Sequence, residues 1–186
     1  MATLRVTAGT LRGRRVPVPP RDVRPTSERA RQAFFNIVGP RLGGATFLDL
    51  FAGSGIFSFE AISRGAASSL AIDNSHHNTE AIAKLAKTYD ANITTMTADA
   101  ITGIARLGDQ VFDVAYADPP YDYAQYDELL AAIDGHAELV GIEHRRRQEP
   151  FTVEPVRLRT IRRVEYGEVW ITLFENRMNA ERRTQN

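Results

Sequence analysis

An acid, two prolines and an aromatic ring directly follow an apolar run in the segment VFDVAYADPPYDYAQYDELL, residues 111–130. Proline lacks a backbone donor, has a fixed φ and holds the preceding residue extended, while its carbonyl oxygen can still accept. Asp118, Pro119 and Pro120 therefore predict a rigid ledge whose main acceptors are the Asp118 carboxylate and the Pro119 carbonyl. This ledge matches a group with two N–H donors, such as the exocyclic amine of a nucleobase. Tyr121 adds a flat ring on which a base can stack, worth about 1–3 kcal/mol.

We expect the ledge to act mainly by positioning an amine for attack on a methyl donor. Hydrogen bonds from the amine to Asp118 and Pro119 strengthen as positive charge develops on nitrogen, so they favour the transition state over the ground state. No strong base is needed, because the methylated, charged amine is acidic and can lose its proton afterwards. The structural alternative is a proline turn in which Asp118 only caps a helix.

A second candidate site lies in LDLFAGSGIFSFEA, residues 48–61, where a glycine turn follows a short apolar run. In α/β sheets, ligands bind outside the carboxyl ends of the strands. Position 58 is Ser and no Lys follows the turn, so neither the complete dinucleotide fingerprint nor a phosphate-binding P-loop is present. The carboxylate of Asp49 would repel a pyrophosphate and suits a cation such as S-adenosylmethionine. The alternative is that Gly53 and Gly55 make only a tight turn.

Two more acids follow the next two predicted strands. Asp73 comes 18 residues after Gly55, a spacing suited to hydrogen bonds from ribose hydroxyls. Asp99 and Ala100 follow the third strand and could bind an adenine amine. Acids at the ends of three successive strands support cofactor binding better than a lone Gly-x-Gly does.

These residues need a sheet to bring them together, and the chain has the alternation that builds one. Strands are predicted at 45–51, 68–73, 92–99, 112–118 and 138–144, with helices at 56–64 and 75–90, and a hairpin at 156–175 turns at Tyr166-Gly167. This pattern predicts an α/β, Rossmann-like, doubly wound sheet of seven strands, mostly parallel, which ends in an antiparallel hairpin. Before it, a short β-hairpin and a helix beginning near Thr26 are expected.

Composition limits the classes of protein. The chain has 186 residues, which points to one domain, and it has no Cys, so disulfides and thiolate chemistry are excluded. Its four His show no ligand spacing, so we expect no metal site. No signal peptide or membrane-spanning run is present, and we expect a cytoplasmic protein that does not bind membranes.

Charge is unevenly distributed along the chain. Residues 1–42 carry nine Arg against Asp22 and Glu28, whereas residues 43–144 carry fifteen acids against four bases. A basic arm on an acidic body suggests a polyanion partner, although the arm could instead pair with the body's own acids. We expect an arm at 1–42 (hairpin plus helix), a ligand-binding domain at 43–175 and a flexible tail at 176–186. The run Arg145-Arg146-Arg147 could bind phosphate or could simply be solvated.

Three segments in this order, RPTSERARQAFFNIV, LDLFAGSGIFSFEAISRGA and DPPY, resemble the RsmD family over roughly residues 3–175. The resemblance implies a class I S-adenosylmethionine-dependent methyltransferase that modifies the N2 amine of a guanine in 16S ribosomal RNA. Within the family pattern, Gln32 replaces an acid and Asn74-Ser75 is atypical.

The resemblance also implies roles for individual residues. It assigns the methionine part of the cofactor to Asp49, Phe51, Ala52, Gly53, Ser54 and Gly55, the ribose to Asp73 with Asn74 beside it, and the adenine to Asp99 and Ala100. It assigns the target guanine to Asp118, Pro119, Pro120 and Tyr121, and RNA contact to Arg12, Arg14, Arg15, Arg24 and Arg29.

Other functions remain possible from sequence. A DNA adenine-N6 methyltransferase can use Asp-Pro-Pro-Tyr, but such enzymes usually need a large target-recognition region, and only about 42 residues precede the core here. A protein glutamine methyltransferase would favour Asn at position 118. A non-catalytic RNA-binding protein would not need the glycine turn and Asp73. We therefore expect ribosomal RNA or the small subunit as partner, and a monomer.

Overall fold

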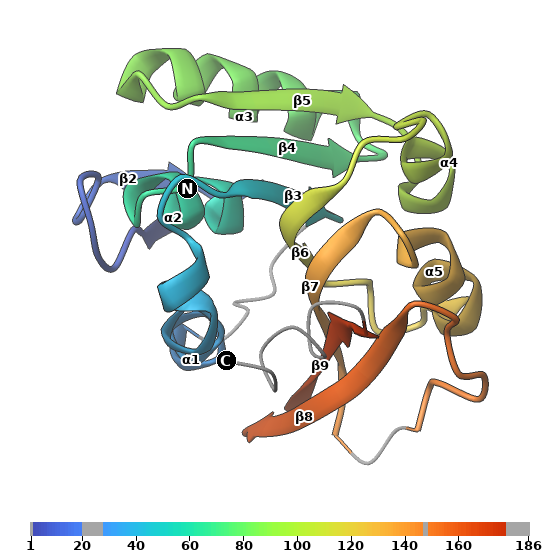
Figure 1. Ribbon diagram of the computed structural model, residues 1–186. Helices are drawn as coiled ribbons and strands as arrows, with labels where there is room; N and C mark the ends of the chain where they lie inside the picture. The colour runs from blue at the N-terminus through green and yellow to red at the C-terminus, as the bar shows by residue number, and fades with distance from the viewer. Residues whose placement is uncertain (1, 20–27, 147–148, 178–186) are drawn as a thin grey trace.

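A computed structural model describes residues 2–19, 28–146 and 149–177, and its centre is one seven-stranded sheet (Figure 1). The strands are β3 (Thr46–Leu50), β4 (Ser68–Asp73), β5 (Ile93–Thr97), β6 (Phe112–Ala117), β7 (Ala137–Arg145), β8 (Leu158–Tyr166) and β9 (Val169–Asn176). Their order is β5-β4-β3-β6-β7-β9-β8, with β3 to β7 parallel and β9 antiparallel to both neighbours. The predicted fold is confirmed, including the terminal hairpin.

The strand order reverses at β3, because β4 and β5 lie on one side of it and β6 and the later strands lie on the other. This strand pairs with β4 on one side and with β6 on the other, and Leu50 lies opposite both Ile72 and Ala117. The carboxyl ends of β3 and β6 therefore meet at the topological switch point, which is where doubly wound sheets bind ligands.

Helices cover both faces of the sheet. One face packs on α1 (Glu28–Val38), α2 (Ile56–Ser63) and α3 (His76–Tyr89), with η1 (Gly39–Arg41) after α1. Its aromatic centre is the Phe57 ring stacked 3.9 Å from that of Tyr116, with Phe34 beside both. The other face packs on α4 (Ala100–Ala105) and α5 (Tyr126–Ile133), which are short helices absent from the sequence prediction.

The N-terminal hairpin is formed as predicted, by β1 (Thr3–Arg5) and β2 (Arg15–Pro17). It is docked on the ends of two helices. The Thr10 N–H donates to the Ser63 carbonyl at 2.8 Å, and the Tyr89 hydroxyl donates to the Arg15 carbonyl at 2.7 Å. Ser63 and Tyr89 end α2 and α3, so the hairpin lies at the edge where the next strands begin (Figure 1).

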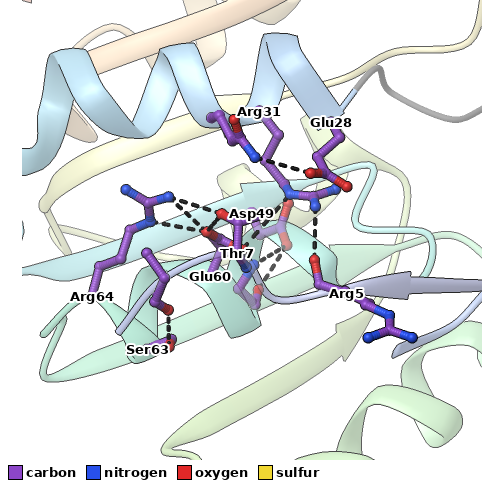
Figure 2. Close-up of polar contacts among 11 residues, drawn as sticks. Arg5, Thr7, Glu28, Arg31, Asp49, Glu60, Ser63 and Arg64 are labelled. Carbon is purple, nitrogen blue, oxygen red and sulfur yellow. Dashed lines mark hydrogen bonds and ion pairs between the residues drawn. The ribbon is translucent and has the colours of Figure 1, made fainter. Parts of the chain in front are cut away.

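Buried charges join this hairpin to α1 and α2 (Figure 2). Glu60 is fully buried and accepts hydrogen bonds from the Thr7 N–H and the Arg64 Nε–H, both at 2.9 Å. The buried Arg31 lies 3.8 Å from Glu60 and donates to the Arg5 carbonyl at 2.8 Å. Burial lowers the pKa of Arg31 and the charge of Glu60 opposes that shift. A buried carboxylate needs such partners, so Glu60 has a structural role.

The described residues include neither a membrane-spanning helix nor a metal-binding cluster. No helix among them is long and apolar enough to cross a bilayer. No group of three or more His, Cys, Asp or Glu side chains there could hold a metal ion.

Candidate active site

The turn after β3 has an unusual backbone. Phe51 (φ 58°), Gly53 (φ 53°) and Gly55 (φ 76°) are all in the left-handed region. That conformation costs a residue with a Cβ about 1–2 kcal/mol, so Phe51 stores strain beside the switch point. At Gly55 a Cβ would also lie 2.8 Å from Cγ1 of Ile82, so close helix packing requires glycine there.

Asp73 holds this turn in place. Its Oδ2 accepts from the Gly53 N–H at 2.7 Å, and its Oδ1 accepts from the Ser75 N–H at 2.8 Å and from the Asn78 amide at 3.1 Å. The acid expected to bind ribose therefore lies at the end of β4, beside the glycine turn, and it also organises that turn. Asn74 is exposed next to it.

Asp49 lies beneath the turn, with only 2% of its surface exposed. Its Oδ2 accepts from the Ser58 N–H at 3.0 Å and from the Ser58 hydroxyl at 2.7 Å. Ser58, which replaces the third glycine of the dinucleotide fingerprint, thus ties α2 to β3. The pKa of Asp49 is raised to about 7, mainly by burial and also by the charges of Asp73 and Asp118, and the Ser58 hydrogen bonds oppose the shift.

Asp99 and Ala100 lie where β5 leads into α4. Asp99 caps that helix, since its Oδ1 accepts from the N–H groups of Ile101 at 3.0 Å and Thr102 at 3.3 Å. Asp99 is exposed and Ala100 is buried. The exposed Asp99 carboxylate therefore lies at the carboxyl end of β5.

The proline ledge lies beside the glycine turn. The Asp118 N–H donates to the Leu50 carbonyl at 3.4 Å, which brings the end of β6 to the end of β3. The Pro119 carbonyl accepts no hydrogen bond within the described residues, as expected for the ledge. The Pro120 carbonyl accepts from the Tyr123 N–H at 2.9 Å and so closes the turn that follows the ledge. Tyr121 is 38% exposed.

Tyr123 connects the ledge to the glycine turn. Its ring lies 5.2 Å from that of Phe51 and 5.3 Å from that of Tyr126, which is buried in the core. The Tyr123 hydroxyl is buried and has no partner among the described residues, and burial raises its pKa to about 12. No local sequence signal separates it from neighbouring tyrosines, because its partner is 72 positions earlier in the chain.

The arginines expected to meet RNA are not gathered at this site. Arg12, Arg14 and Arg15 are exposed on the hairpin, at the edge of the sheet opposite the ledge, and Arg14 lies 5.3 Å from the Tyr89 ring. Arg29 is exposed in the first turn of α1. Arg24 lies outside the described residues.

The strand order, the glycine turn after β3 and the Asp-Pro-Pro-Tyr ledge after β6 define a class I S-adenosylmethionine-dependent methyltransferase. Besides its carboxylate, the cofactor carries a sulfonium, an ammonium, ribose hydroxyls and an adenine amine, which are cations or hydrogen-bond donors. The side chains at the carboxyl ends of β3, β4, β5 and β6 fit these groups, because Asp49, Asp73, Asp99 and Asp118 supply carboxylates there.

Comparison with known proteins assigns the family. The chain matches the family model described as conserved hypothetical protein 95 over residues 4–175. It is 31% identical over 138 residues to ribosomal RNA small subunit methyltransferase D of Escherichia coli K12, covering 73% of this chain and 69% of that protein. Bacillus subtilis YlbH is 29% identical over 185 residues, covering 94% of this chain and 100% of that protein. The chain belongs to the RsmD family.

Solved structures that resemble this chain share its fold over nearly the whole chain. The Escherichia coli protein yhhF has a TM-score of 0.82 and 28% identity, covering 94% of this chain and 98% of that one. A Thermus thermophilus protein, TTHA0928, has a TM-score of 0.77 and 27% identity, covering 92% of this chain and 99% of that one.

Proposed function

We propose that this enzyme transfers a methyl group from S-adenosylmethionine to the exocyclic N2 amine of a guanine in 16S ribosomal RNA. The observation that carries the proposal is the contact between the ledge and the glycine turn, in which the Asp118 N–H reaches the Leu50 carbonyl at 3.4 Å. A base amine on the ledge and a cofactor on the turn would then be neighbours.

The protein's own contribution is to hold the amine. Asp118 and the Pro119 carbonyl accept its two N–H groups, and the exposed Tyr121 ring supports the base by stacking. Both acceptors favour the charge that develops on nitrogen. When bound, the cofactor supplies an electrophilic methyl group on its sulfonium. The proton leaves the methylated nitrogen for solvent or for Asp118.

The cofactor contacts proposed for this chain follow the turn. Phe51, Ala52, Gly53, Ser54 and Gly55 would hold the methionine part, and the field of the buried Asp49 would favour its positive charges. We further propose Asp73 and Asn74 for the ribose, and Asp99 and Ala100 for the adenine.

Partner and organisation are part of the same proposal. The substrate is ribosomal RNA or the small ribosomal subunit, and the protein works as a cytoplasmic monomer. Arg12, Arg14, Arg15, Arg24 and Arg29 contact RNA from an arm at residues 1–42, the catalytic domain spans 43–175, and residues 176–186 form a tail.

The test is to incubate the protein with radiolabelled S-adenosylmethionine and with RNA, DNA and protein fractions, and to digest the labelled material to nucleosides. We expect label in small-subunit RNA as N2-methylguanosine. Label in DNA as N6-methyladenine, or in protein as methylglutamine, would reject the proposal, and so would label on another RNA nucleotide.

A further inference from the structure

Arg145 is the last residue of β7, and its guanidinium lies 4.7 Å from the centre of the Tyr121 ring. This separation is within the range of a cation–π contact. Strands β6 and β7 are parallel neighbours, with Ala117 opposite Ile142, so their carboxyl ends lie at the same edge. The ring on which the target base is proposed to stack therefore has one face covered by an arginine 24 positions away in sequence.

The backbone that carries Arg145 is held firmly. Arg145 pairs with Val169 of β9, and the Arg146 N–H donates to the Glu168 carbonyl at 2.9 Å. The preceding side chain, His144, is buried against the ring of Tyr126 and accepts from or donates to the Thr172 hydroxyl at 2.8 Å. Since side chains alternate along a strand, Arg145 points to the opposite face from His144.

The charge of Arg145 is available for RNA. Within the described part of the chain Arg145 forms no ion pair with Asp or Glu, and its side chain is exposed. The nearby Arg163 differs, because Glu149 binds it at 2.7 and 2.9 Å. The hairpin arginines lie at the other edge of the sheet. Among the described residues Arg145 is thus a cation without an acidic partner, and it lies next to the ledge.

We propose that Arg145 positions the target nucleotide, by backing one face of Tyr121 so that the base stacks on the other, and by binding the adjacent RNA phosphate. The inference rests on the proposed function and adds to it a residue to which the resemblance assigned no role. A planar guanidinium can do both tasks, since its plane stacks on the ring and its edge N–H groups reach a phosphate. A lysine would keep the charge without the plane.

The test compares Arg145→Ala with Arg145→Lys and with Arg146→Ala, which removes the same charge from the neighbouring exposed residue. For each variant, RNA affinity is measured against salt concentration, and single-turnover methyl transfer is measured at saturating RNA. For Arg145→Ala we expect a salt slope smaller by about 0.7–0.9 and transfer slower by roughly tenfold. Arg145→Lys should keep the wild-type salt slope of RNA binding but should transfer the methyl group more slowly than wild type. Arg146→Ala should keep the rate.

A double-mutant cycle with Tyr121→Ala separates positioning from a purely structural effect. Once the ring is removed, Arg145→Ala should slow transfer no further, while it still weakens RNA binding. Additive losses of rate, or equal losses in Arg145→Ala and Arg146→Ala, reject the inference. Wild-type protein that makes no N2-methylguanosine rejects the proposed function instead, so the two failures are distinguishable.

Discussion

At the scale of single residues, the carboxylates of the site have different tasks although they lie at one edge. Asp118 follows β6 at the ledge, whereas Asp49 is buried under α2 and accepts hydrogen bonds from Ser58. Asp73 orders the glycine turn through the Gly53 N–H. The difference follows from burial, since a fully buried carboxylate must find protein donors, whereas Asp118 is only partly buried.

Asp118 is expected to act on the substrate amine alone. Asp118→Ala should lower methyl transfer by at least about 10²–10³-fold, because the developing charge loses its acceptor, while cofactor affinity stays nearly unchanged. The rate is measured with labelled cofactor and the affinity by calorimetry. Asp122→Ala, exposed in the same loop, is the control and should retain activity. If Asp118→Ala lost cofactor affinity as strongly as methyl transfer, Asp118 would serve the cofactor and the assignment to the substrate amine would be wrong.

Asp49 predicts how cofactor affinity depends on pH. Its pKa of about 7 means that the carboxyl is partly protonated near neutrality, and a cationic ligand favours the ionised form. Binding below pH 7 therefore releases a proton, so affinity should rise with pH, by up to about tenfold per unit, and level off above 7. Calorimetry between pH 6 and 8.5 measures this. Asp49→Asn should bind more weakly at pH 8 with a flat profile, and an unchanged slope in that variant would contradict the assignment.

At the scale of elements, the N-terminal hairpin is attached to the catalytic domain by hydrogen bonds and buried charge. Gly9 shows how close the contact is. It has φ +80°, and a Cβ there would lie 1.6 Å from the Ser63 carbonyl oxygen. Gly13 has a similar φ of +84°, but nothing lies within 4 Å of a Cβ built there. A Cβ at Gly13 would therefore cause backbone strain alone, whereas a Cβ at Gly9 would also clash with α2.

Alanine at these two positions should therefore have unequal effects. Gly13→Ala should cost about 1–2 kcal/mol of stability from its backbone conformation alone. Gly9→Ala should cost about 2–5 kcal/mol, because overpacking against Ser63 adds to the same strain. Urea unfolding of both variants measures the difference. Equal losses would mean that the hairpin is not seated on α2 as described.

The substitution of Gln32 for the family's acid also has an explanation at this scale. Gln32 donates to Glu28 one turn earlier, at 2.9 Å, so a carboxylate remains on the first turn of α1. Glu28 in turn favours the charged form of the buried Arg31. Glu28 therefore supplies an acid near Arg31 although position 32 is Gln.

At the scale of the whole molecule, the two explanations for the basic arm apply to different arginines. Arg31 and Arg41 pair with the body's own Glu60 and Glu175. Arg12 and Arg15 are exposed and form no ion pair within the described residues. The second group faces away from the ledge, so we expect it to hold a large RNA at a distance from the reacting base.

Neutralising Arg12, Arg14 and Arg15 to Gln should therefore weaken RNA binding and flatten its salt dependence, by about 0.7–0.9 in slope for each phosphate that the variant no longer binds. Cofactor affinity and the transfer rate at saturating RNA should stay close to wild type. The control replaces Lys84 and Lys87, exposed on α3, with Gln. Unchanged RNA affinity in the triple variant, or an equal loss in the control, would reject a specific role for the arm.

The amino-acid sequence alone determined the elements and the chemistry each carries, because strand periodicity, glycine turns and proline geometry are local properties of the chain. It predicted the seven-stranded sheet and the two motifs at its edge, and it missed the short helices α4 and α5. Only the tertiary structure decided which side chains meet: Asp49 with Ser58, Thr7 with Glu60, and Tyr121 with Arg145. The last two pairs join residues far apart in the chain, and all three depend on how the elements pack, which no local pattern encodes.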